Sequence, residues 1–270
     1  MNDRMEQLLY VGPDIGIDPD AGIGLDTGSA MSHLNAIAHE HMSPSLKQRT
    51  RNLTADHHLK KLLTQWFKGE EQIEPVLWIY GDQANIVSAI VYHAALDRRR
   101  PVVAFASRHN ANGQYLSSQQ RLFKMVYSVL FQVLQVLEED SSFAVVGVDK
   151  PFTELGLSID SMSLALQYIE YVLGLLPECI CIVDGWNFIT IDAEEQVDVV
   201  LKDFLELFKR PSATAAEGDR GGLRLLLTTP GNCEMLQSFK NQLLSGFGLG
   251  GHVGSQGMRL CTILRGMEWD

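Results

Sequence analysis

The chain alternates between short, continuously apolar runs and longer segments in which apolar residues recur every three or four positions. Runs of the first kind are typical of strands buried on both faces, and segments of the second kind are typical of amphipathic helices. The pattern predicts five strands, at residues 76–80, 102–106, 179–183, 223–229 and 258–264. It predicts helices near residues 56–68, 86–96, 122–137, 158–173, 197–208 and 235–244.

Three segments qualify this outline. Ser158 is the residue type preferred at a helix N-cap, so it is predicted to cap the fourth helix. Residues 143–148 fit either a short strand or an irregular link, and residues 245–257 are predicted to form a flexible connection.

The alternation of apolar strands and amphipathic helices predicts the fold class. Such strands pair in parallel, because each crossover helix returns the chain to the same end of the sheet. We therefore expect an α/β, three-layer sandwich with a mainly parallel five-stranded sheet. Residues 1–45 have no such periodicity and are predicted to form a flexible arm, with residues 46–270 as a single domain.

The first predicted strand leads through Gly81 into a predicted helix, which is the setting of a phosphate-binding P-loop. The consensus of that loop is G-x-x-x-x-G-K-[ST]. Gly81 and Ser88 occupy its first and last positions, but Ile86 replaces the second glycine and Val87 replaces the lysine. Valine cannot place a positive charge on the phosphates, so the loop is predicted to be degenerate. Its candidate nucleotide-binding residues are Gly81, Asp82, Gln83, Ala84, Asn85, Ile86, Val87 and Ser88.

Other candidate residues follow from the strand ends, because ligands of such sheets bind at the carboxyl ends of the strands. Ser88 and Asp184 are candidate magnesium ligands, although Ser88 also fits an ordinary helix position and Asp184 also fits a loop cap. Thr228 lies near the end of the fourth strand, and Arg108, at the end of the second strand, is the nearest basic residue that could replace the lysine. Trp186 and Phe188 fit either ligand stacking or, as we expect, core packing.

Five motifs occur in an order and spacing typical of one family. They are Leu77–Gly81 after a helix that contains Trp66, Phe105–Arg108, Tyr127–Gln132, Cys181–Asn187 and Leu226–Pro230. Across about residues 50–265 the chain thus resembles the fungal NACHT-like or nephrocystin-type N-terminal NTPase modules of the STAND class. The resemblance implies a P-loop NTPase fold that switches conformation with nucleotide state and passes this change to other regions.

The departures from that family fall on functional residues. Asp82 adds a negative charge beside the expected phosphate, and Asn187 and Phe188 stand where the family has acidic residues. Thr229 precedes Pro230, where the family has a sensor arginine. We therefore expect a catalytically inactive NTPase-like module that acts as a protein-interaction or scaffold subunit and needs no cofactor. The alternatives are a regulatory switch that binds Mg-ATP or Mg-GTP with weak or no hydrolysis, and an unrelated α/β enzyme.

Composition narrows the partners and the compartment. The formal charge of −11 disfavours nucleic-acid binding, which needs a basic face. The basic run Arg98–Arg100 fits a solvated helix end better than a phosphate site. No apolar run is long enough to span a membrane. Four cysteines without a C-x-x-C pair suit a reducing compartment, so an intracellular location, cytoplasmic or nuclear, is expected. A protein partner or larger assembly is expected, with the oligomeric state open.

Overall fold

The structure is a computed structural model of the 270-residue chain. It describes residue 34 and residues 54–55, 57–70, 73–107, 116–139, 154–209, 222–239, 245–248 and 258–259. The expectations for the arm at residues 1–45, apart from Leu34, for residues 143–148 and for Arg108 lie outside these ranges. Leu34 itself is fully buried in the main core.

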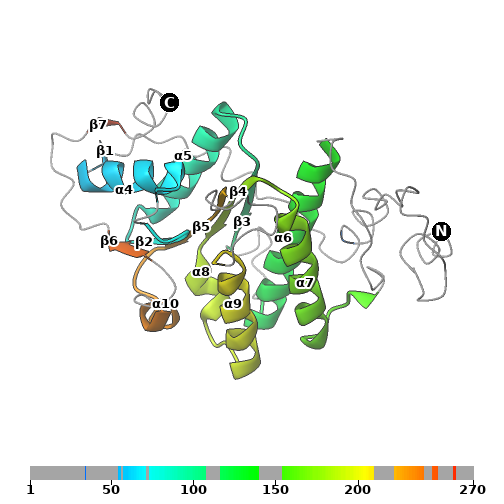
Figure 1. The fold of residues 1–270 in the computed structure, drawn as a ribbon. Helices are drawn as coiled ribbons and strands as arrows, with labels where there is room; N and C mark the ends of the chain where they lie inside the picture. Colours follow the sequence, from blue (N-terminus) through cyan, green and yellow to red (C-terminus); the bar gives the residue numbers. More distant parts are fainter. Residues whose placement is uncertain are drawn as a thin grey trace.

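A parallel sheet of five strands forms the centre of the fold (Figure 1). Its strands, in spatial order, are β3 (Val102–Ala106), β4 (Glu178–Asp184), β5 (Gly222–Thr229), β2 (Val76–Tyr80) and β6 (Ser245–Gly248). Every neighbouring pair runs parallel. The predicted α/β fold class is confirmed.

Helices cover both faces of this sheet. The helices α4 (His57–Lys68) and α5 (Ala84–Asp97) pack with the strand side chains Leu77 and Ile79. The opposite face, which carries Val76 and Trp78, is covered by α6 (Ser118–Glu139), α7 (Asp160–Gly174), α8 (Trp186–Thr190), α9 (Glu195–Leu207) and α10 (Glu234–Phe239). Successive strand residues thus enter different apolar clusters, which is why β2 and β3 are apolar throughout and show no alternation with polar residues.

The fifth strand of the sheet is not the predicted one. The apolar run at residues 258–264 predicted it, whereas the sheet uses Ser245–Gly248 beside β2, and Met258–Arg259 (β7) pairs antiparallel with Thr54–Ala55 (β1). The hydropathy pattern does not predict β6, because two of its four residues are glycine and the strand has no apolar run. Backbone pairing with β2 holds it in the sheet. At Gly248 a Cβ atom would lie 2.7 Å from the Tyr80 ring, so glycine lets the strands approach.

Two smaller predictions are also corrected. Helix α7 has Ile159 at its N-cap and no side-chain capping bond, and Ser158 accepts a hydrogen bond from Ser161 through its backbone oxygen. The basic run Arg98–Arg100 is a solvated helix end only in part, because Arg98 is the C-cap of α5 and Arg99 is exposed, whereas Arg100 has partners elsewhere in the fold. Its guanidinium donates to the carbonyl of Phe67 at 2.7 Å and pairs with Glu178 at 3.4 Å, which ties the end of α4 to the start of β4.

Candidate functional site

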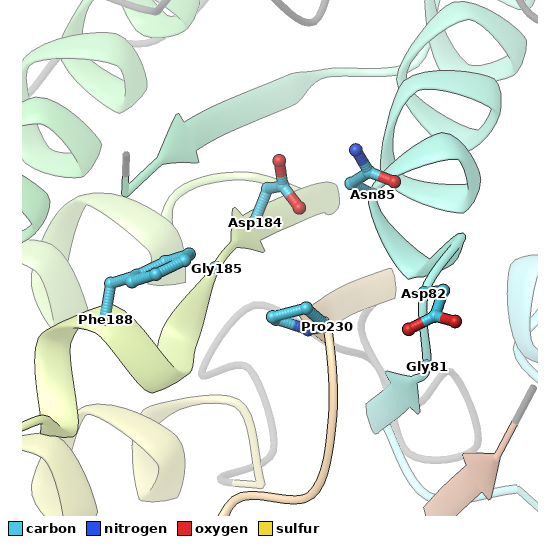
Figure 2. Close-up of a pocket in the computed structure, with 7 residues that line it drawn as sticks. All are labelled: Gly81, Asp82, Asn85, Asp184, Gly185, Phe188 and Pro230. Atoms are coloured by element: carbon cyan, nitrogen blue, oxygen red, sulfur yellow. The ribbon is translucent and has the colours of Figure 1, made fainter. Parts of the chain in front are cut away.

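The connections that leave β2 and β5 diverge at the carboxyl edge of the sheet. Helix α5, which follows β2, packs on one face, and α10, which follows the neighbouring β5, packs on the other. Such a switch point opens a crevice where open α/β sheets bind ligands. A cavity of about 380 Å³ lies there, lined by Gly81, Asp82, Asn85, Asp184, Gly185, Phe188 and Pro230 (Figure 2).

The turn between β2 and α5 is shorter than the loop of the P-loop consensus, because the helix begins only three residues after Gly81. Gly81 has a φ of +127°, and its N–H donates to the carbonyl of Thr229 at 3.0 Å. Exposed Gln83 takes the N-cap position without a side-chain capping bond, and helix α5 begins at Ala84. The N–H of Ala84 donates to Gly81, and the N–H of Ile86 donates to Gln83. Backbone N–H groups cradle phosphate in a working loop, but here these two are already bonded within the turn.

The position of the missing lysine faces the core. Val87 is completely buried among the side chains that α4 and α5 pack against the sheet, and Ala84 is buried in the same cluster. Ile86 packs against that cluster as well. Among the eight residues of the candidate loop, only Gly81, Asp82 and Asn85 line the cavity.

Three candidate residues instead form a buried hydrogen-bond chain. The Ser88 hydroxyl lies 2.8 Å from that of Thr228, and the Thr228 hydroxyl donates to a carboxylate oxygen of Asp184 at 2.7 Å. Since Thr228 has one hydroxyl proton, Ser88 donates to Thr228. All three residues are nearly inaccessible to solvent. The structure therefore brings the two predicted magnesium ligands to the same place, with Thr228 between them.

The described lining of the cavity carries two acidic residues. Asp82 is exposed and Asp184 is buried, and no residue in the described lining is basic. Carboxylates in this position repel a polyphosphate. Within the described ranges, no group of three or more histidine, cysteine or acidic residues is placed to hold a metal ion. Arg108, the predicted replacement for the lysine, lies outside those ranges.

Three lining residues were not among the predicted site residues: Gly185, Phe188 and Pro230. Gly185 has a φ of +81° and stands at the N-cap of α8, where a Cβ atom would lie 2.5 Å from the backbone oxygen of Ser107. The short helix it starts turns Trp186 into the core, as expected, but brings Phe188 to the cavity. This turn could have been predicted from Gly185, because a glycine directly after the last strand residue Asp184 indicates a left-handed backbone conformation.

Comparisons with known proteins find little. No protein-family model matches the chain, and no curated protein matches it. Among solved structures, the chain is similar to the Walker-type ATPase PABY2304 of Pyrococcus abyssi, with 13% sequence identity and a TM-score of 0.39. The match covers 72% of this chain and 49% of that protein, so it spans about half of the ATPase.

The fold is a three-layer α/β sandwich, with helices on both faces of a parallel sheet. The segment Gly81–Ser88 runs from the end of β2 into the first turn of α5, and Asp184 ends a strand two places away in the sheet, across β5. In the described part of the chain, no helix has the length and apolar character required to cross a membrane.

Proposed function

We propose that this chain is a catalytically inactive NTPase-like module that acts as a protein-interaction or scaffold subunit. The observation that carries the proposal is the burial of Val87, since the position of the phosphate-binding lysine faces the apolar core and not the cavity. The hydrolytic switch is then lost while the scaffold and its surfaces remain.

Electrostatics support the same proposal. Asp82 and Asp184 line the crevice in which the β- and γ-phosphates would lie. The hydroxyl of Ser88 is hydrogen-bonded to Thr228 and is not directed at a metal ion. The resemblance to fungal NACHT-like or nephrocystin-type modules of the STAND class supports the protein-interaction role, because such modules act by passing a conformational change to other protein regions. The free buried thiols of Cys179, Cys181 and Cys233 support an intracellular setting.

A second candidate function is a regulatory switch that still binds Mg-ATP or Mg-GTP. It is favoured by the cavity itself, which lies where this class of fold binds nucleotide, and by the retention of Ser88 and Asp184 beside it. In this case another residue supplies the positive charge that Val87 lacks.

Calorimetric titration of the full chain with Mg-ATP and Mg-GTP separates the two candidates. We expect no saturable heat up to about 1 mM nucleotide, a limit that corresponds to roughly 4 kcal/mol of binding free energy. Magnesium-dependent nucleotide binding that is lost in Asp184→Ala would overturn the inactive-module proposal. The control is Asp203→Asn, at an exposed position of α9, which should keep any such binding. A hydrolysis assay on the same samples distinguishes a switch that binds from one that turns over.

A further inference from the structure

Two arginines lie close together at the amino edge of the sheet, at the opposite end of β5 from the cavity. Arg224 is near the start of β5 and is only 8% exposed. Arg100 lies between α5 and β3. Burial lowers the pKa of Arg224, and the nearby charge of Arg100 lowers it further. Two positive charges are therefore held near one another in a place that is largely shielded from water.

Arg100 has several partners, whereas Arg224 has almost none. The Arg100 guanidinium pairs with Glu178 at 3.4 Å, donates to the Phe67 carbonyl at 2.7 Å and lies 4.8 Å from the centre of the Phe67 ring. Arg224 donates through its Nη1 atom to the carbonyl of Leu223 at 3.4 Å, which is longer than the roughly 3.2 Å limit of an ordinary N–H···O bond. Among the described residues, no carboxylate pairs with Arg224.

The end of α4 explains how Arg224 fits, but not how its charge is balanced. Gly69 follows α4 with a φ of +76°, and a Cβ atom there would overlap the Nη2 atom of Arg224. Glycine thus makes room for the guanidinium against the end of the helix. A helix C-terminus carries roughly half an elementary negative charge. Since Glu178 neutralises only one of the two guanidinium groups, the helix end leaves part of the other charge unbalanced.

We propose that Arg224, together with Arg100, binds a carboxylate of a partner protein. A guanidinium pairs with a carboxylate in a planar, bidentate manner, so this ligand supplies the acceptors that Arg224 lacks within the fold. A carboxylate also carries a single negative charge, whereas a phosphate dianion is repelled more strongly by the neighbouring Glu178. Burial of a charge without a counter-ion is unfavourable. A role in binding therefore accounts for Arg224 where its contacts within the fold do not.

This inference rests on the proposed function and names the chemistry of its partner. The overall charge of −11 does not attract an acidic protein, so the affinity depends on close contact with the two arginines and not on long-range attraction. A glutamine in place of the partner's glutamate keeps the shape of the side chain but leaves the arginines without a counter-charge, so it is expected not to bind.

The test uses the full chain and two capped pentapeptides that are identical except at the central residue, which is glutamate or glutamine. Inorganic phosphate is the third ligand. Binding is measured by ligand-detected NMR titration up to about 10 mM ligand. We expect saturable binding of the glutamate peptide, none of the glutamine peptide, and weaker binding of phosphate. The proposal is overturned if the glutamate peptide does not bind, if both peptides bind equally, or if phosphate binds more tightly than the glutamate peptide.

Variants locate the site. Arg224→Met keeps an unbranched side chain without the charge and should weaken binding of the glutamate peptide by at least about tenfold. Arg224→Lys keeps the charge but loses the planar fork, and should weaken it by about three- to tenfold. Lys202→Met, at an exposed position of α9 on the opposite face of the sheet, removes an equal charge and should leave binding unchanged. Equal losses in Arg224→Met and Lys202→Met would show a general charge effect and overturn the assignment.

Thermal unfolding distinguishes a charge that serves a ligand from one that supports the fold. Methionine needs no counter-ion, so Arg224→Met should leave the melting temperature unchanged or raise it. If Arg224 instead stabilises the end of α4, the melting temperature of Arg224→Met should fall by roughly 2–4 °C or more relative to Lys202→Met. Such a fall would assign a structural role to Arg224 and overturn the proposal.

The nucleotide titration keeps this proposal separate from the proposed function, because the two sites lie at opposite edges of the sheet. Binding of the glutamate peptide without magnesium-dependent nucleotide binding supports both proposals. If neither ligand binds, the carboxylate site alone is overturned. If both ligands bind, the inactive-module proposal is overturned and the carboxylate site remains. Nucleotide binding without binding of the glutamate peptide overturns both.

Discussion

The side-chain amide of Gln132 pairs with both backbone groups of Ala104. Its oxygen accepts from the Ala104 N–H at 2.9 Å, and its Nε2 atom donates to the Ala104 carbonyl at 3.0 Å. The Nε2 atom also reaches Ser128 one turn earlier in α6. Since β3 is an edge strand among the described residues, the amide takes the place that a residue of a further strand would occupy. Gln132 thereby satisfies the outward-facing backbone groups of β3 at Ala104.

Gln132→Met should destabilise the protein, because the N–H and carbonyl of Ala104 then lose their partners in a buried position. We expect the free energy of unfolding to fall by about 2–3 kcal/mol in urea titrations. Gln135→Met, at an exposed position on the same helix, is the matched control and should change stability by less than about 0.5 kcal/mol. Similar losses in both variants would contradict the edge-pairing role of Gln132.

Thr228→Val should cost more stability than Ser88→Ala. Valine has the shape of threonine, but it removes the donor to Asp184 and the acceptor for Ser88, whereas Ser88→Ala removes only the first donor of the chain. We expect losses of about 2–3 kcal/mol and about 1 kcal/mol, respectively. A double-mutant cycle measures their coupling, and strict additivity would contradict the chain of hydrogen bonds.

Much of this architecture could be predicted from the sequence, because strands that are buried on both faces of the sheet give short, continuous apolar runs. Strands β2, β3, β4 and β5 and the longer helices follow from that signal. Strand β6 does not, since Gly248 is required by the close approach of the Tyr80 ring and not by burial. The sequence also placed Asp184, Ser88 and Thr228 near one another through the rule on strand ends.

The composition of the cavity wall was harder to predict. Whether Trp186 or Phe188 faces the cavity depends on the left-handed turn at Gly185, which rotates the short helix after it. For Val87, the sequence predicted the chemistry but not the orientation of the side chain. It showed that the lysine is missing, but the burial of this position follows from the start of α5 at Ala84, which the sequence did not predict.

Restoring the consensus lysine should therefore not restore a phosphate site. Val87→Lys places an ammonium group among Leu77, Ile79 and other buried side chains, so we expect it to cost more than about 3 kcal/mol of unfolding free energy. It should give no thermal shift with Mg-ATP. Val199→Lys, at a position 54% exposed on α9, is the control and should be close to neutral. A stable Val87→Lys protein that binds nucleotide would contradict the structure of the loop.

The stability of the protein should fall above about pH 9 through two buried thiols. Burial raises the pKa of Cys179 to about 12, with Glu178 adding to the shift, and burial raises the pKa of Cys181 well above its ordinary value. Above pH 9 the unfolded chain loses these protons while the folded chain keeps them. The free energy of unfolding therefore decreases as the pH rises, by about 1.4 kcal/mol per pH unit and thiol.

Urea unfolding between pH 8.5 and pH 10 measures this slope. Unfolded tyrosine loses its proton near pH 10, so the raised pKa values of Tyr92, Tyr127 and Tyr171 add to the slope only at the top of this range, and the thiols dominate below about pH 9.5. The control is the double variant Cys179→Ala and Cys181→Ala, which lowers stability at every pH through lost packing but should flatten its pH dependence. An unchanged slope in this variant would assign the effect to other groups.

The turn that forms the cavity should depend on Gly185. Gly185→Ala introduces a Cβ atom 2.5 Å from the Ser107 oxygen and 2.9 Å from the Phe188 ring, at a φ that L-residues avoid. We expect a loss of at least about 2 kcal/mol in thermal or urea unfolding, together with a displaced Phe188. Gly174→Ala is the matched control, because its Cβ atom would meet nothing within 4 Å at the end of α7. That substitution should be neutral or stabilise the protein by up to about 1 kcal/mol, since alanine restricts the unfolded chain. If Gly185→Ala behaves like Gly174→Ala, the left-handed turn is not what shapes the cavity.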